Sequence, residues 1–231
     1  MINMYIQQLY SNILLIPCRL CGAPSKYHAL CEDCIKELPL LESACPRCAM
    51  PTTSSQQCGQ CLTKPPVQDL SFSLFRYQEP IKRLIADFKY HDTLYLSSLF
   101  SHLMTKQLTD RILPQCFIPI PLHPKRLRQR GYNQSLELAK DLSKLLNISY
   151  SNQYLNRIID TAPQASLPFK QRKKNMQHAF SLMNSNIPSH IALIDDVLTT
   201  GHTANAAAKT LRQGGAEIIE VWTIARTIRH D

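Results

Sequence analysis

The stretch IALIDDVLTTGHT occupies residues 191–203 and decides which fold the rest of the chain adopts. Four apolar residues, typical of a buried strand, lead into two adjacent acids and then into a short loop of Thr and Gly. Residues 203–213, followed by Gly214 and Gly215, predict a helix directly after this loop. Successive backbone N–H groups at the start of such a helix can hold a phosphate.

The two acids and the loop form a candidate site for a sugar phosphate. The acids are placed to accept hydrogen bonds from a diol or to help hold a divalent cation, and Gly201 permits close approach of a ligand. The alternative, a strand that ends in an acidic turn with Thr as N-cap, explains neither the paired acids nor the loop. The candidate residues are Asp195, Asp196, Val197, Leu198, Thr199, Thr200, Gly201, His202 and Thr203.

The sequence around this stretch predicts an α/β domain. Residues 70–74 alternate as a strand, and Pro80 lies in the expected first turn of a helix. The apolar face of that helix carries Ile81, Leu84, Ile85 and Phe88, and a second helical stretch follows it. Further strands are expected at residues 116–120, 154–159 and 217–224, and a helix is expected at residues 134–145 with Asn133 as its N-cap. Strands that alternate with helices imply a parallel sheet with a ligand site beyond its carboxyl edge.

Eight of the nine cysteines form four C-x-x-C pairs before residue 62, and the pairs repeat. The first two pairs recur 27 residues later, so two copies of one unit are expected. Cys116, the ninth, is expected to be a buried strand residue. The paired cysteines are Cys18, Cys21, Cys31, Cys34, Cys45, Cys48, Cys58 and Cys61.

Each unit has the form C-x2-C-x9-C-x2-C, which supplies four thiolates to one tetrahedral ion. Four sulfur ligands select zinc, or less often an iron centre, so two structural zinc ions are predicted. The exact repeat favours one ion per unit, although an interleaved arrangement remains an alternative. A closed site of four thiolates has no open coordination position, and a catalytic role for the zinc is therefore not expected.

Charge and composition indicate a globular protein with an anionic ligand or partner. Lys and Arg number 26 against 17 Asp and Glu, which gives a formal net charge of +9. Two clusters, at residues 125–130 and 170–174, hold basic residues and no acidic ones.

The Thr-Lys-Pro-Pro segment at residues 63–66 is typical of a linker, and it divides the chain into two expected domains, residues 1–64 and residues 65–231.

The first sixteen residues have the apolar spacing of a short amphipathic helix that packs onto the protein, or alternatively of a helix on a membrane surface. They lack the basic start and the small-residue cleavage site of a signal peptide. A cytoplasmic location is therefore expected, where C-x-x-C pairs favour metal ligation over disulfides.

Several motifs together resemble one known family. Residues 191–203 look like the phosphoribosyl pyrophosphate signature of type I phosphoribosyltransferases. The stretches FRYQEPIKRLIADFKY at residues 75–90 and IPIPLHPKRLRQRGYNQ at residues 118–134, the NR…T..Q..L…R..N…AF pattern at residues 156–180 and the cysteine pairs resemble the ComF family. These competence or DNA-utilisation proteins join a double zinc ribbon to a phosphoribosyltransferase-like domain. The resemblance covers essentially the whole chain.

The resemblance implies a role for each part of the site. Asp195 and Asp196 would meet the ribose hydroxyls of phosphoribosyl pyrophosphate, bound with magnesium, and residues 199–203 would hold its 5-phosphate. Residues 121–126 would take the place of the pyrophosphate loop, and residues 160–174 that of the flexible flap. The candidates for contact with pyrophosphate or DNA are Lys125, Arg126, Arg128, Arg130, Lys170, Arg172, Lys173 and Lys174.

Two functional classes follow from the resemblance. The first is a competence protein that acts on transforming single-stranded DNA with a helicase or another DNA-processing protein, with Tyr132 and Phe169 as stacking candidates. The second is an active phosphoribosyltransferase that transfers phosphoribose to an unidentified base or amine. Thr199 stands where purine-salvage transferases have a third acid that serves as a base, so that role is unfilled at this position. A phosphoribosyltransferase fold can also bind its ligand without catalysing transfer.

Overall fold

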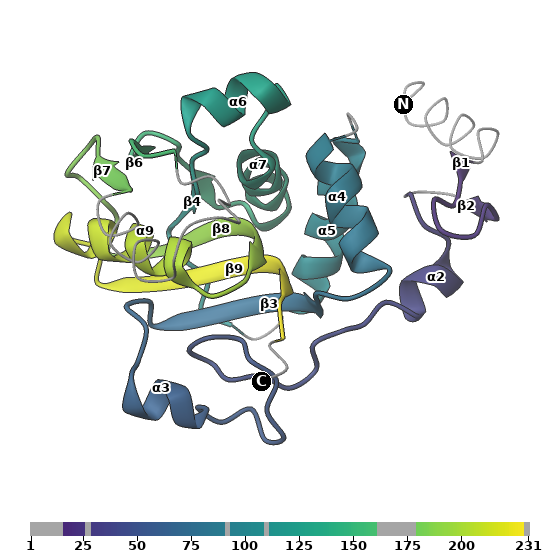
Figure 1. Ribbon diagram of the computed structural model, residues 1–231, viewed down its shortest axis with the longest axis horizontal. Helices are drawn as coiled ribbons and strands as arrows, with labels where there is room; N and C mark the ends of the chain where they lie inside the picture. Colours follow the sequence, from purple (N-terminus) through teal and green to yellow (C-terminus); the bar gives the residue numbers. More distant parts are fainter. Residues whose placement is uncertain (1–15, 26–28, 91–92, 109–110, 161–178, 229–231) are drawn as a thin grey trace.

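The computed structural model describes residues 16–25, 29–90, 93–108, 111–160 and 179–228 (Figure 1). The amphipathic segment expected at the N-terminus and most of the expected flap lie outside the described residues. The same holds for Phe169 and for the basic candidates Lys170, Arg172, Lys173 and Lys174.

The secondary structure divides into a short cysteine-rich part and an α/β part. The first part contains β1 (Ile16–Pro17), β2 (Pro24–Ser25), α2 (Glu32–Lys36) and α3 (Gly59–Thr63). The second part contains β3 (Leu70–Arg76), α4 (Ile81–Tyr90), α5 (Tyr95–Lys106), β4 (Cys116–Pro119), α6 (Pro124–Arg130), α7 (Gln134–Leu146), β5 (Ser149–Tyr150), β6 (Leu155–Arg157), β7 (Phe180–Leu182), β8 (His190–Leu198), α9 (His202–Gln213) and β9 (Ile218–Arg226).

Five strands form one parallel sheet in the order β3-β9-β8-β4-β5. The chain leaves β8 through α9 toward β9, but it leaves β4 through α6 and α7 toward β5, on the other side. The strand order therefore reverses between β4 and β8, which is where ligands bind in open parallel sheets, beyond the carboxyl ends of the strands. The segment with the two acids ends at this point.

Helices cover both faces of the sheet, so its central strands are buried on both sides (Figure 1). Alternate residues of β8 enter two different cores: Ala192 and Ile194 face the core beneath α4, α5 and α7, while Ile191 and Leu193 face the core beneath α9. Trp222 of β9, fully buried, fills the centre of the first core, with its ring 5.3 Å from that of Phe117.

Most predicted elements of the α/β part are confirmed. The four apolar residues of α4 are buried, Cys116 is buried in β4, and the predicted strands and helices at residues 70–74, 134–145, 191–194, 203–213 and 217–224 lie within or overlap β3, α7, β8, α9 and β9. Pro80 lies just before α4 instead of in its first turn, where its carbonyl accepts a bond from the Leu84 N–H.

Three elements differ from the prediction. The loop expected at residues 121–126 is cut short by the helix α6, because Pro124 starts a helix that His123 caps. The strand expected at residues 154–159 is the short β6, which pairs antiparallel with β7 outside the main sheet. Both acids lie within β8, which continues to Leu198, and not after its end.

Asn133 caps α7 as predicted, and its replacement is expected to be measurable. Its side chain accepts a hydrogen bond from the Ser135 N–H at 3.1 Å and donates one to the Ile120 carbonyl at 3.0 Å. Asn133→Ala should lower the free energy of unfolding by about 1–2 kcal/mol, because it leaves helix N–H groups without a partner. Urea unfolding would measure this, and Asn133→Ser, which can still cap, should cost less; an unchanged midpoint for Asn133→Ala contradicts the expectation.

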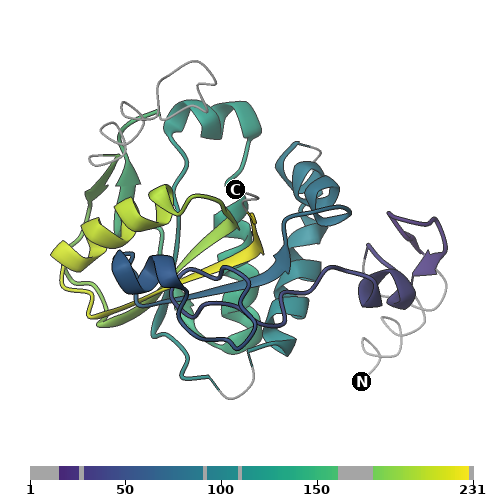
Figure 2. The same cartoon turned by 60° about the horizontal axis from the view of Figure 1, so that its bottom comes forward.

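The two cysteine units lie at different places on the α/β part (Figure 2). The first lies beyond α4, where Arg19 Nε contacts Asp87 at 2.8 Å. The second lies along β3, the edge strand: the Ser71 N–H donates to the Pro46 carbonyl at 2.7 Å, and the Leu41 N–H donates to the Leu74 carbonyl at 3.0 Å. These contacts partner an exposed sheet edge that would otherwise offer free hydrogen-bonding groups.

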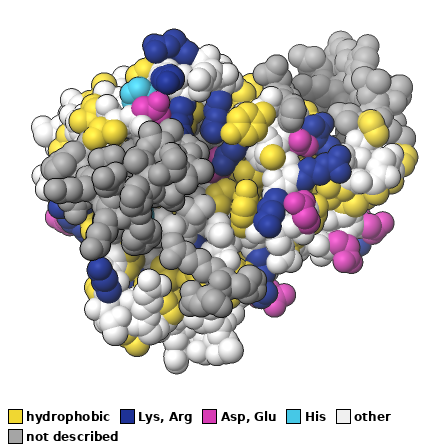
Figure 3. All heavy atoms as spheres, in the orientation of Figure 1, with side chains coloured by type: hydrophobic (Ala, Val, Ile, Leu, Met, Phe, Trp, Pro, Cys, Tyr) yellow, Lys and Arg dark blue, Asp and Glu magenta, His cyan; other side chains and the backbone are white. Residues whose placement is uncertain are grey.

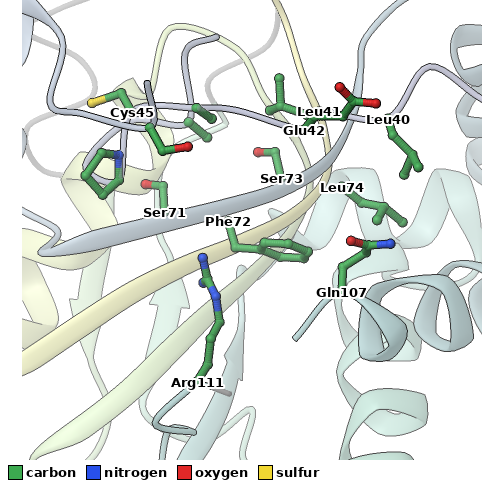
Figure 4. Close-up of a pocket in the computed structure, with 14 residues that line it drawn as sticks. Leu40, Leu41, Glu42, Cys45, Ser71, Phe72, Ser73, Leu74, Gln107 and Arg111 are labelled. Atoms are coloured by element: carbon green, nitrogen blue, oxygen red, sulfur yellow. The ribbon is translucent and has the colours of Figure 1, made fainter. Parts of the chain in front are cut away.

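The contact between the second unit and β3 encloses a cavity of about 360 Å³ (Figure 4). Phe72 and Arg111 form one side of it, with the guanidinium 5.2 Å from the centre of the ring, and Glu42 and Ser73 lie on its wall. The residues that bond the second unit to β3 also line this cavity.

In the part of the chain that the structure describes, every helix is too short or too polar to cross a membrane.

Candidate functional site

The eight paired cysteines gather into two separate groups. Within each group the four sulfur atoms lie within 4.8 Å of one another, and each group takes two consecutive C-x-x-C pairs. The predicted sequential arrangement is confirmed and the interleaved alternative is wrong. The first group is Cys18, Cys21, Cys31 and Cys34, and the second is Cys45, Cys48, Cys58 and Cys61.

The repeat of 27 residues in the sequence is also a repeat of backbone structure. The Cys18 N–H donates to the Ala23 carbonyl at 2.7 Å, and the Cys45 N–H donates to the Met50 carbonyl at the same distance. Gly22 in the first unit and Ala49 in the second both have positive φ, at 78° and 55°. These bonds close each C-x-x-C segment into the tight turn that points both thiols at one centre.

The donor set of each group fits zinc. Sulfur atoms at about 2.3 Å from a tetrahedral zinc ion are about 3.8 Å apart. The observed separations are 3.7 Å between Cys21 and Cys31 and 3.7 Å between Cys48 and Cys58. Burial alone would raise the pKa of Cys18, but backbone N–H groups that point at its sulfur lower it to about 6. Each group therefore suits one structural zinc ion, held without an open coordination position.

The acid pair lies near the carboxyl end of β8 and is held from two helices. The Ser135 hydroxyl, in the first turn of α7, donates to Asp195 Oδ1 at 3.1 Å, and the Asp196 N–H donates to the same oxygen at 2.9 Å. Asp196 Oδ2 lies 2.8 Å from Lys89 Nζ, in the last turn of α4. The structure therefore brings α4, α7 and β8 together at the two carboxylates.

The negative charges of the two carboxylates repel each other. Burial, and then the charge of Asp196, raise the pKa of Asp195 from 3.8 to about 7. Burial also opposes the charge on Lys89, but attraction by both carboxylates outweighs it and raises the pKa of Lys89. A divalent cation or the hydroxyls of a diol would relieve this repulsion, so the residues present fit a site for magnesium and a sugar.

The loop after β8 leaves the start of α9 accessible. Gly201 is the N-cap of α9 with φ 76° and offers no capping side chain, although the Thr200 hydroxyl accepts a long bond from the His202 N–H at 3.4 Å. Thr199 and Thr200 are exposed, and His202 and Thr203 are half-buried. Val197 and Leu198, by contrast, pack against the two cores and contribute no polar side chain. The loop offers backbone N–H groups and hydroxyls to an anion.

The basic residues of α6 have three different surroundings. Arg126 turns inward, with Nε 3.3 Å from Asp160 Oδ1. Arg130 contacts Tyr90, with the guanidinium 5.2 Å from the ring centre, and donates to Gln134 at 3.1 Å. Lys125 and Arg128 are exposed on the outer side of α6, where basic side chains gather in Figure 3. The basic cluster at residues 125–130 thus contains one residue that pairs with Asp160, one that packs α6 against Tyr90 and two that are exposed to solvent.

Three residues of the site were not predicted from the sequence. Lys89 and Ser135 hold the acids, and Arg157 of β6 is buried close to them. Burial lowers the pKa of Arg157, as does the neighbouring Arg126, while Asp195 and Asp160 oppose this shift. Lys89 and Arg157 both lie in stretches that resemble the ComF family, and this was the one signal that could have identified them.

The raised pKa of Asp195 predicts a pH dependence of stability in metal-free buffer. Between about pH 4 and pH 7 the folded protein keeps a proton on Asp195 that the unfolded chain, with a pKa of about 3.9, has lost. The free energy of unfolding should therefore fall as the pH rises through this range. Urea unfolding of wild type and Asp195→Asn at pH 4.5 and 7.5 would measure it; equal pH dependence in the two proteins contradicts the expectation.

Comparison with known proteins agrees with this architecture. Residues 10–62 match a family model described as a double zinc ribbon domain. The chain is 32% identical to the DNA utilization protein YhgH of Shigella flexneri, over 94% of this chain and 100% of that protein. It is 35% identical to Competence protein F of Haemophilus influenzae, over 86% of this chain and 91% of that protein. It is 27% identical to Competence protein ComFC of Streptococcus pneumoniae, over 85% and 87% of the two chains.

The similarity to these competence and DNA-utilization proteins extends over the cysteine units and the α/β part alike. A parallel sheet flanked by helices follows two groups of four thiols, in the order that the sequence motifs predict. The chain therefore belongs to the ComF family of competence and DNA-utilisation proteins.

Proposed function

We propose that this protein acts in the uptake or processing of transforming single-stranded DNA, and that its α/β domain binds phosphoribosyl pyrophosphate with magnesium. The position of the acid pair is the observation that supports this ligand. Asp195 and Asp196 lie at the point where the strand order of the sheet reverses, directly before the Gly201 loop at the start of α9. A ribose diol at the acids and a 5-phosphate at the loop suit this arrangement.

The charges around the acids support a ligand with a second anionic group. Arg126 and Arg157 lie on the β6 side of the acids, and Lys89 lies on the α4 side. A pyrophosphate that is bound with magnesium would meet guanidinium groups there, which are suited to bind phosphate oxygens. Magnesium would neutralise the remaining charge of the carboxylates and the pyrophosphate.

The exposed basic residues of α6 support contact with DNA. Lys125 and Arg128 are exposed and can contact a phosphate backbone, whereas Arg126 pairs with Asp160. Tyr132, between α6 and α7, packs near the Phe88 ring and donates to the Phe88 carbonyl, so it ties this segment to α4. We place this activity in the cytoplasm, with a helicase or another DNA-processing protein as partner.

Calorimetry with phosphoribosyl pyrophosphate and magnesium tests the ligand. Wild type should bind, and ribose 5-phosphate should compete because it keeps the diol and the phosphate. Lys125→Glu with Arg128→Glu should leave this binding intact, because both side chains are exposed on α6, whereas Arg126 is the residue of this cluster that pairs with Asp160. Absence of binding by wild type at millimolar ligand contradicts the proposed ligand.

The same double variant tests the DNA surface. Binding of single-stranded DNA by wild type should weaken steeply with salt, since backbone contacts release counterions. Lys125→Glu with Arg128→Glu should weaken DNA binding and lower the salt dependence, whereas Lys144→Glu, on the surface of α7, serves as the matched control. DNA binding that is equal in the two variants removes α6 from the proposed surface.

A second candidate function is transfer of the phosphoribosyl group to a base or amine, with release of pyrophosphate. The burial of Arg157 beside Arg126 favours it, because cationic groups away from water stabilise a leaving pyrophosphate strongly. Thr199 is not an acid and supplies no base. Pyrophosphate release from the donor, tested with a panel of bases and amines, separates transfer from binding: release that Arg157→Met abolishes supports transfer, and binding without release excludes it for that panel.

A further inference from the structure

Arg226, the last residue of β9, joins the second cysteine group to the loop after β8. Its side chain is buried. Nε donates to the Cys48 carbonyl at 2.8 Å, and Nη1 donates to the Leu198 carbonyl at 2.8 Å and also to the Thr199 carbonyl. One rigid, planar cation therefore touches a metal-site turn and the start of the loop.

The bonds from Arg226 help to determine where the loop N–H groups point: the Leu198 carbonyl also accepts from the Thr227 N–H at 3.1 Å, whereas the Thr199 carbonyl accepts from Arg226. A peptide group is planar and trans, so its carbonyl and its N–H point in opposite directions. The carbonyls of Leu198 and Thr199 are turned toward the guanidinium, and the N–H groups of Thr199 and Thr200 are therefore turned away from it. An anion site built from these N–H groups depends on the orientation that Arg226 imposes.

The other end of this connection depends on the second cysteine group. Cys48 is a ligand of that group, and its carbonyl belongs to the turn that the Cys45 N–H and the Ala49 N–H close. The Cys58 N–H also donates to Cys45 Sγ at 3.3 Å. A zinc ion fixes the spacing of the four sulfurs, so it fixes the Cys48 carbonyl as well.

The second group adjoins the loop in space. A cavity of about 190 Å³ lies between them, and its wall includes Cys48, Cys61, Thr200, His202 and Arg226. The Val67 N–H, just after the second group, donates to Asn205 in the first turn of α9 at 2.7 Å. The first group contacts α4 instead, through Arg19 and Asp87.

We propose that Arg226 is a positioning residue that makes the affinity of the loop for its anion depend on zinc in the second site. This inference rests on the proposed binding of phosphoribosyl pyrophosphate. Zinc at the second site orders the Cys48 turn, and Arg226 transmits that order to the peptide groups at residues 198–200. Zinc at the first site has a smaller effect on the loop.

The test compares Arg226→Lys with Arg212→Lys. Lys keeps the charge at position 226 but lacks the forked guanidinium that bonds the Cys48 carbonyl through Nε and the loop carbonyls through Nη1. Arg212 is a matched control, because its guanidinium also binds carbonyls, those of Val67 and Ala216, but at the far end of α9. The readouts are zinc content, calorimetric affinity for phosphoribosyl pyrophosphate with magnesium, and hydrogen exchange of the Asn205 and Thr227 amides, which donate to the Gly201 and Leu198 carbonyls of the loop.

Arg226→Lys should keep two zinc ions, lose exchange protection at the Asn205 and Thr227 amides and bind about tenfold more weakly, as expected for lost bonds to a charged donor. Arg212→Lys should keep both the protection and the affinity. Cys58→Ser, which removes a ligand of the second group, should weaken binding about tenfold more than Cys21→Ser, which removes a ligand of the first. Adding Arg226→Lys to Cys58→Ser should weaken it little further.

Wild-type protection and affinity in Arg226→Lys overturn the inference, as do equal losses in Cys58→Ser and Cys21→Ser. If Arg226→Lys does not fold, the comparison of the two cysteine variants decides. If wild type binds no phosphoribosyl pyrophosphate, the proposed ligand fails. Hydrogen exchange then decides the coupling alone: it stands if protection of the Asn205 and Thr227 amides is lost in Cys58→Ser and kept in Cys21→Ser.

Discussion

Removal of zinc is expected to unfold the cysteine-rich part of the protein. Between the thiols this part buries few apolar side chains, among them Leu30, Leu38 and Ala49. Metal binding of about 10–16 kcal/mol per site would therefore supply most of its folding free energy. A strong chelator should lower the melting temperature and the protection of amides in residues 18–62, while the sheet keeps part of its protection.

The two sites should differ in how far their loss spreads. Ala49 of the second unit packs in the core beneath α9, and Pro46 and Leu41 bond to β3, so loss of the second ion should loosen the sheet edge. Cys31→Ser should remove the first ion and leave β3 protected. Elemental analysis of the purified variants, with melting curves, would measure both effects.

Cys116→Ala provides the control for these variants. Cys116 is buried in β4, where burial raises the pKa of its thiol, and it lies apart from both groups of four. Cys116→Ala should keep two zinc ions per chain, because it removes a thiol but no ligand. Wild-type protein that binds no metal, or chelation that leaves the melting temperature unchanged, contradicts the zinc model.

The sequence was most informative where one short segment determines the structure. The spacing of the cysteines predicted both groups, because a C-x-x-C turn brings its two thiols together by local geometry alone. The apolar residues before Asp195 predicted the central strand, because a strand in a parallel sheet is buried on both faces. Asn133 was identified as a cap because the capping bond spans two residues.

The remainder depends on contacts between distant segments. Lys89 meets Asp196 across more than a hundred residues, and no local pattern distinguishes it from a surface lysine on α4. Arg226 reaches Cys48 in the same way. The cluster at residues 125–130 looked uniform in the sequence, but the helical turn of α6 directs Arg126 and Lys125 to different sides.

Lys89 also determines how the acid pair must be tested. Asp196→Asn removes a carboxylate that would bind the ligand, but it also leaves the partly buried Lys89 without this partner. Breaking a fully buried pair costs about 3–5 kcal/mol, and this pair should cost less but still lower the stability, so weak binding by the single variant has two explanations. Lys89→Met with Asp196→Asn removes both charges, and it should recover much of the stability that Asp196→Asn loses.

Replacement of both acids should abolish binding of phosphoribosyl pyrophosphate without unfolding the protein. Asp195→Asn with Asp196→Asn and Lys89→Met should bind at least about 100-fold more weakly than wild type, because lost charged partners typically cost 2–5 kcal/mol. Lys89→Met alone should raise the pKa of Asp195 above about 7, since the charge of Lys89 favours the ionised form of Asp195. Its magnesium-dependent binding should then require a higher pH than that of wild type. Calorimetry at pH 6.5 and 8.5 with urea unfolding of each variant would measure this. A stable triple variant that binds as tightly as wild type excludes the acid pair as the ribose site.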